Sequence, residues 1–154
     1  MVEEVLSRHL SVQVAAVVGE PDALKGELPI AYVQLRSGTN ADAAELLSLC
    51  LREVPERAAV PIDVVIIEAI PLTAVGKIFK PALRLDAMGR AARKVIASVL
   101  GDCSGVEVEV LETEARAAVI LRLPVGPSAE AHAATLRQAF AGFLFDIRII
   151  MEVE

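Results

Sequence analysis

The sequence predicts an α+β protein: a small antiparallel or mixed sheet flanked by helices, followed by a smaller α-β-β-α-β unit. Three observations predict this class. Runs rich in β-branched residues at 12–18, 30–35 and 62–67 predict strands. Apolar residues at helical spacing within 41–54 predict a helix between the last two strands. The segment 83–100, rich in alanine and arginine, predicts a longer helix that opens the second unit.

Composition bounds the class of protein. The 154 residues carry a formal net charge of -6, and 55% of them are hydrophobic, so one compact domain or two very small ones can form a core. The acidic balance and an aromatic content of 3% argue against nucleic acid as a partner. Glu68 interrupts the longest apolar run, so no membrane span is predicted. Cys50 and Cys103 predict two reduced thiols in a cytoplasmic protein rather than a disulfide framework.

Local signals set the elements of the first unit. Residues 2–8 predict a short helix, and Gly19 is expected to stop the first strand. Asn40 is the expected N-cap of the helix within 41–54. The segment 71–77 is predicted to be a loop or a short hairpin.

The second unit follows a change of composition after Pro81, so we predict domains at 1–84 and 85–154. A hairpin is expected from 106 to 123, and Ser128 is expected to cap a helix that ends near Phe143. Alternating apolar residues in 146–153 predict a strand with one exposed face. This order is that of a ferredoxin-like unit that lacks one strand, and an open sheet edge could pair with another chain.

Several kinds of active site are excluded by the residues present. His9 and His132 each stand alone, and the chain has neither a Gly-x-Ser-x-Gly elbow nor clustered metal ligands, so we predict no triad hydrolase and no metal site. The pair Gly76-Lys77 does not belong to a phosphate-binding Walker loop, because Pro71 stands where that loop needs glycine and Ile78 where it needs serine or threonine.

The most specific feature is the segment Pro71-Leu72-Thr73-Ala74-Val75-Gly76-Lys77. It resembles the Pro-x-Thr-x-x-Gly-Lys motif near the C-terminus of adenylate-forming enzymes, which include acyl-CoA synthetases, luciferases and peptide-synthetase adenylation domains. The resemblance covers residues 2 to about 84. It includes Val2-Glu3-Glu4-Val5-Leu6, Ala15-Ala16-Val17-Val18-Gly19, Pro21-Asp22 and Lys25-Gly26-Glu27, in the family's order and spacing.

This resemblance implies that residues 1–84 are the small C-terminal lid of an AMP-forming acyl-CoA synthetase. Such enzymes join a carboxylate to the α-phosphate of ATP and then transfer the acyl group to the thiol of CoA. By resemblance, Lys77 is the adenylation lysine, and Gly76 and Lys77 contact the ATP and acyl-adenylate. A cation within about 4 Å of the reacting groups offsets their repulsion by roughly 4 kcal/mol at an effective dielectric constant of 20.

The family places ATP, its Mg²⁺ and the acyl pocket in a large N-terminal adenylation domain, which is the expected partner of this chain. The chain alone is therefore predicted to be inactive. The family's aromatic-lysine pair before Pro61 is absent here, and Arg52 or Arg57 are candidates for contact with the phosphates of CoA. A solvated surface position is the alternative for both arginines.

Residues 85–154 carry no motif that the family shares. The alternative function is therefore a non-catalytic binding, dimerisation or sensor module, with a homodimer formed through this extension. Phe140, Phe143, Leu144 and Phe145 gather near one helix end, where they either complete a core or form an interface, and the core is the favoured interpretation.

Overall fold

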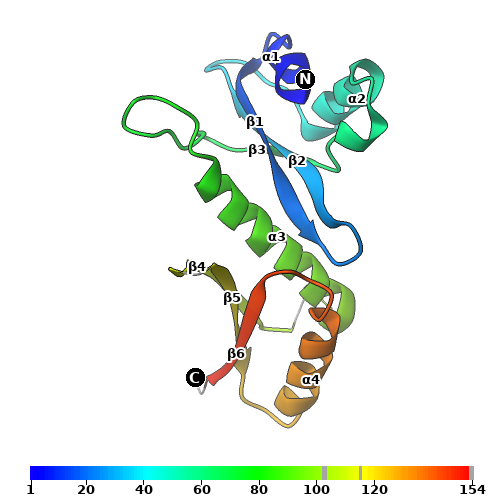
Figure 1. The fold of residues 1–154 in the computed structure, drawn as a ribbon, viewed down its shortest axis with the longest axis vertical. Coiled ribbons are helices and arrows are strands. Elements are labelled where there is room, and N and C mark those ends of the chain that lie inside the picture. Colours follow the sequence, from blue (N-terminus) through cyan, green and yellow to red (C-terminus); the bar gives the residue numbers. More distant parts are fainter. Residues whose placement is uncertain (102–103, 115, 153–154) are drawn as a thin grey trace. The chain divides into compact units, whose positions relative to one another are not determined.

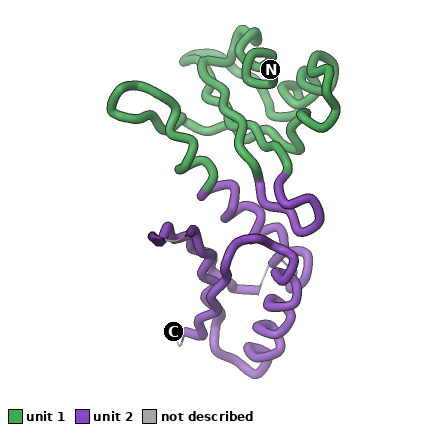
Figure 2. The backbone as a smooth tube through the Cα atoms, viewed as in Figure 1, with its two compact units in different colours: residues 1–19, 28–84 green, residues 20–27, 85–154 purple. Residues whose placement is uncertain are grey.

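The computed structural model describes residues 1–101, 104–114 and 116–152, so Cys103 and Val153 lie outside the described residues. The described residues form two three-stranded sheets, ordered β1-β2-β3 and β4-β5-β6, with helices beside each (Figure 1). The α+β prediction is confirmed. The chain divides into two compact units (Figure 2). Unit 1 contains residues 1–19 and 28–84, and unit 2 contains residues 20–27 and 85–154.

Unit 1 holds the first sheet and two α-helices. Its elements are α1 (Val2–Ser7), β1 (Val12–Asp22), β2 (Gly26–Leu35), α2 (Ala43–Glu53), a 3-10 helix (Arg57–Ala59) and β3 (Val64–Ile66), with the tip of the β1–β2 hairpin assigned to unit 2. Strand β3 is parallel to β2, with Val65 opposite Tyr32. The core includes Leu6 of α1 together with Leu46 and Cys50 of α2, all fully buried.

Three local expectations for unit 1 were wrong. Strand β1 does not stop at Gly19, because that glycine keeps an extended backbone and the strand continues to Asp22. The N-cap of α2 is Asp42 rather than Asn40, since the Asp42 carboxylate accepts a hydrogen bond from the Glu45 backbone N–H at 2.7 Å. Helix α3 (Lys80–Leu100) begins three residues before the expected start at 83. Pro81 lies in its first turn, where a backbone N–H would have no intrahelical partner, so a proline is tolerated there.

Unit 2 has the predicted α-β-β-α-β order. After α3 come β4 (Glu107–Glu112), β5 (Ala117–Pro124), α4 (Ala129–Ala139) and β6 (Asp146–Glu152). Strand β5 pairs with β4 in an antiparallel and with β6 in a parallel arrangement. Because β5 and β6 are direct neighbours, an additional strand could join this sheet only at its outer edges, β4 and β6.

Side chains on one face of the second sheet form the core of unit 2. Burial alternates along β6, as predicted. Helix α4 is shorter than expected: it ends at Ala139, and Ser128 caps it without a side-chain hydrogen bond. The rings of Phe140, Phe143 and Phe145 pack with centroids 5.1–6.0 Å apart, which confirms the core interpretation for these three residues. Leu144 remains 79% exposed.

Candidate functional site

The lysine motif forms a tight hairpin loop between β3 and α3. Its two arms are joined by an antiparallel bridge between Leu72 and Ile78. The Phe79 N–H donates to the carbonyl of Pro71 at 2.8 Å, and the Thr73 N–H donates to the carbonyl of Lys77 at 2.7 Å. Lys77 therefore stands at the point where the loop closes. We call residues 71–79 the lysine loop; it projects between β3 and α3 in Figure 1.

Thr73 and Gly76 account for the shape of the lysine loop. The Thr73 hydroxyl oxygen accepts a hydrogen bond from the Lys77 N–H at 3.1 Å, while the Thr73 carbonyl accepts one from the Gly76 N–H at 2.9 Å. Gly76 has a φ of 82°, a left-handed conformation that glycine adopts without strain. The threonine and glycine of the motif thus fix the backbone that carries Lys77.

The Lys77 side chain is exposed, and its ammonium has no hydrogen-bond or ion-pair partner in the described part of the chain. Three neighbouring apolar side chains of the loop are also exposed: Leu72, Val75 and Phe79. Val75 is 81% exposed. An unpaired cation beside an apolar patch is typical of a surface that another molecule or domain covers.

Lys80 follows the loop and forms an ion pair with Glu3 of α1, with 2.9 Å between Nζ and Oε1. The same Glu3 oxygen accepts a hydrogen bond from the Val17 backbone N–H of β1 at 2.9 Å. Partial burial acts to raise the pKa of Glu3, but the hydrogen bonds from Lys80 and Val17 outweigh it and lower the pKa below its ordinary value. Glu3 thereby joins α1 and β1 to the first residue of α3.

Arg52 and Arg57 are not brought together with Lys77. Arg52 lies in the last turn of α2, and Arg57 begins the 3-10 helix that follows. Both are exposed. In Figure 1, α2 and the lysine loop lie on opposite sides of the first sheet.

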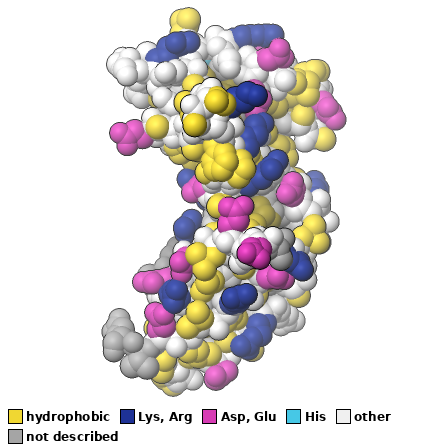
Figure 3. Space-filling view, turned by 60° about the vertical axis from the view of Figure 1, so that its left-hand side comes forward, with side chains coloured by type: hydrophobic (Ala, Val, Ile, Leu, Met, Phe, Trp, Pro, Cys, Tyr) yellow, Lys and Arg dark blue, Asp and Glu magenta, His cyan; other side chains and the backbone are white. Residues whose placement is uncertain are grey.

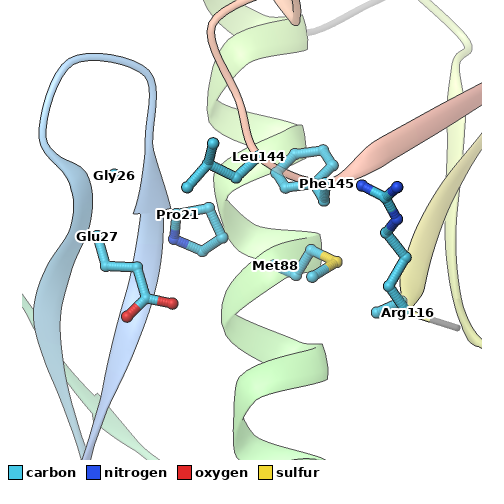
Figure 4. A pocket seen from close by; sticks show the side chains of 8 residues that line it. Pro21, Gly26, Glu27, Met88, Arg116, Leu144 and Phe145 are labelled. Carbon is cyan, nitrogen blue, oxygen red and sulfur yellow. The ribbon is translucent and has the colours of Figure 1, made fainter.

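Other features of the described residues do not add to this site. A pocket of about 190 Å³ within unit 2 is lined mainly by apolar side chains, including Pro21, Met88 and Phe145, with Glu27 and Arg116 at its ends (Figure 4). None of its lining residues belongs to the lysine loop. No three His, Cys, Asp or Glu side chains in the described ranges are grouped as metal ligands. On the face drawn in Figure 3, basic and acidic side chains are interspersed.

The family model of the AMP-binding enzyme C-terminal domain matches residues 1–77, which is half of the chain. The chain belongs to this family. The match ends at Lys77, so it includes every residue of the Pro-x-Thr-x-x-Gly-Lys motif. Among the described residues, no helix is both long and apolar enough to cross a membrane.

Relatives of this AMP-binding C-terminal domain are CoA ligases. The marinolic acid–CoA ligase of a Pseudoalteromonas species is 39% identical over 112 residues, which cover 73% of this chain and 17% of that protein. The acetyl-coenzyme A synthetase of Deinococcus radiodurans is 40% identical over 106 residues, covering 69% of this chain and 15% of that protein. The chain thus spans about a sixth of the length of these relatives.

Solved structures agree with this assignment. The crystal structure of an acyl-CoA synthetase from Brucella canis has a TM-score of 0.51 and 33% identity, covering 58% of this chain and 17% of that one. Apo MatB from Rhodopseudomonas palustris has a TM-score of 0.54 and 27% identity, covering 58% and 18%.

Two features of the structure were not predicted from the sequence. The ion pair of Glu3 with Lys80 joins residues 77 positions apart, and no local pattern in the sequence indicated it. The second is the environment of Glu20. Its carboxylate is buried in unit 2 and accepts a hydrogen bond from Lys94 of α3 at 2.5 Å.

Proposed function

We propose that residues 1–84 are the C-terminal lid of an AMP-forming acyl-CoA synthetase and that Lys77 is its adenylation lysine, with residues 85–154 as an extension. The observation that carries the proposal is the unpaired Lys77 ammonium on a closed loop, in a chain of the AMP-binding C-terminal family. The overall reaction is carboxylate + ATP + CoA to acyl-CoA + AMP + pyrophosphate.

Lys77 acts in the first half-reaction. A carboxylate oxygen of the acid attacks the α-phosphorus of ATP, and the bond from that phosphorus to the bridging oxygen breaks as pyrophosphate leaves. Both reactants are anionic, so a cation at about 4 Å lowers the barrier by roughly 4 kcal/mol at an effective dielectric constant of 20. The exposed backbone at Gly76 lets the loop approach the nucleotide closely.

The N-terminal adenylation domain is the partner that this mechanism requires. It would supply the acyl pocket and the Mg²⁺ that accompanies ATP, so we expect no turnover from the 154-residue chain alone. The side chains of Leu72, Val75 and Phe79 are apolar and exposed. This supports the proposal that the adenylation domain covers the lysine loop in the whole enzyme. In the second half-reaction, Arg52 and Arg57 are the candidates for contact with the phosphates of CoA, and the enzyme would work in the cytoplasm.

The decisive variant is Lys77→Ala in the full-length ligase that contains this chain. Formation of acyl-adenylate from the free acid, measured as pyrophosphate release, should fall by a factor on the order of 10³, as expected when about 4 kcal/mol is lost. Conversion of supplied acyl-adenylate to acyl-CoA should stay within about twofold of the wild type.

Lys25→Ala is the matched control, because Lys25 is also an exposed lysine in a turn. It should leave both half-reactions unchanged. An equal loss in both half-reactions for Lys77→Ala would contradict the assigned role, as would an unchanged rate of pyrophosphate release.

A second candidate function, for residues 85–154 alone, is self-association or ligand sensing. The outer strand β6 of the second sheet favours it, because an unpaired edge strand can accept a strand from another chain. Light scattering coupled to size exclusion measures the mass directly. A mass near 16.3 kDa at every concentration would rule out the homodimer.

A further inference from the structure

The base of the lysine loop is held by a contact outside the motif. Lys80 is three residues beyond Lys77 and is the first residue of α3. Its ammonium is bound by Glu3, whose carboxylate oxygen also accepts the Val17 N–H. One side chain thus joins three segments of unit 1: α1, β1 and the exit of the lysine loop.

We propose that Glu3 is a positioning residue for Lys77, acting through Lys80. This inference rests on the proposed function of Lys77, because it concerns how that side chain is presented. The bridge between Leu72 and Ile78 ties the arms of the loop to each other but not to the rest of unit 1. The Glu3–Lys80 pair supplies a tie to α1 and β1.

Lys80 is close to Lys77 along the chain. Only Ile78 and Phe79 separate Lys77 from Lys80, and these three residue steps span at most about 11 Å, so a shift of Lys80 also shifts the backbone of Lys77. A charge-assisted hydrogen bond is shorter and stronger than a neutral one, which suits a fixed contact. Displacing a catalytic group by about 1 Å can reduce a rate by as much as a hundredfold.

The first test measures hydrogen exchange of the loop amides by NMR in the 154-residue chain. Glu3→Gln keeps an oxygen acceptor for the Val17 N–H but removes the charge that holds Lys80. The Gly76 and Lys77 amides, which donate to Thr73, should exchange about two- to threefold faster in Glu3→Gln and Lys80→Met. Lys80→Arg should restore most of the protection.

Glu4→Gln is the matched control. Glu4 is the next residue of α1, and among the described residues its carboxylate is paired with the N-terminal amine alone, at 3.6 Å. It should leave loop exchange at the wild-type rate. Equal exchange at Gly76 and Lys77 in Glu3→Gln and Glu4→Gln would overturn the proposal, as would a uniform increase across the amides of unit 1, which indicates a general loss of stability.

The second test measures half-reactions in the full ligase. Glu3→Gln should lower the rate of adenylation about tenfold and leave thioester formation from supplied acyl-adenylate within about twofold. If Lys77→Ala abolishes adenylation while Glu3→Gln matches Glu4→Gln, positioning by Glu3 is wrong and the function of Lys77 stands. If Lys77→Ala leaves adenylation intact, the proposed function itself fails.

Discussion

Each unit contains one ion pair between a glutamate and a lysine of α3, and the two pairs differ in their surroundings. In unit 1, the Glu3 and Lys80 side chains are 41% and 39% exposed, and the bonded Glu3 oxygen also accepts a backbone N–H. In unit 2, the Glu20 side chain is 5% exposed, and its second carboxylate oxygen has no hydrogen-bond partner among the described residues.

The two glutamate–lysine pairs therefore have different roles. Water can solvate Glu3 if Lys80 is removed, so the cost to folding is small and the pair mainly fixes geometry. Glu20 has no such alternative, because removal of Lys94 leaves a buried carboxylate without a counter-charge. Burial of one partner thus decides whether an ion pair governs stability or position.

The largest expected effects come from the cores of the two units. Leu46→Ala and Leu136→Ala each truncate a fully buried leucine, the first in α2 and the second in α4, and each should lower the free energy of unfolding by about 3 kcal/mol. Urea unfolding followed by amide NMR signals separates the units. If each unit has its own core, each variant shifts mainly the signals of its own unit; equal shifts everywhere would show a single cooperative core.

The two ion pairs should give the next largest contrast. Lys94→Met should lower the free energy of unfolding by about 2–3 kcal/mol, because Glu20 stays buried and unpaired. Lys80→Met should cost about 0.5 kcal/mol, because Glu3 is half-exposed.

Urea midpoints of the two methionine variants test this contrast directly. Replacing Glu20 with Met in the Lys94→Met background should recover most of the loss, since it removes the buried charge. Equal costs for the two lysines would refute the contrast based on burial.

An effect smaller than that of Lys94→Met is a loss of stability in alkali at Cys50. Burial raises the pKa of this fully buried thiol, so the unfolded chain loses the proton first. Its contribution is complete below the unfolded pKa of about 8.5 and declines as pH rises, by at most about 1.4 kcal/mol per pH unit. The measurement compares urea midpoints at pH 7 and pH 9.5 with those of Cys50→Ala, both in a Cys103→Ser background. If the urea midpoints of the two proteins changed equally between pH 7 and pH 9.5, the predicted contribution of Cys50 would be wrong.

Local chemistry explains which parts of the fold the sequence could predict. The motif predicted a loop or hairpin at 71–77 because threonine, glycine and lysine in that spacing close a turn by backbone and hydroxyl contacts alone. It could not predict the Glu3–Lys80 contact, which joins segments far apart in the chain. No pattern within a few residues encodes such a pairing.

The errors at Asn40 and Gly19 share a cause. Asparagine is compatible with a helix cap or a loop, and glycine with a turn or a strand. The surrounding residues determine which of the two forms. Asp42, and not Asn40, is the N-cap, because Glu45 stands three residues after Asp42 and its backbone N–H donates to the Asp42 side chain. Gly19 stayed extended because β1 continues beyond it in the first sheet. The family resemblance reached residue 84, so the prediction for residues 85–154 rested on composition, a capping residue and hydrophobic alternation. These predicted the order of elements but not the direct pairing of β5 with β6.

The acidic edge of the second sheet has a consequence for handling the protein. Glu107, Glu109 and Glu112 are exposed along β4, which is an outer strand. Two molecules that met edge to edge at this strand would set carboxylates against carboxylates, which opposes runaway strand addition in concentrated solution at neutral pH. That colloidal protection fades near the isoelectric point of about 5.0, so purification and storage belong well above it.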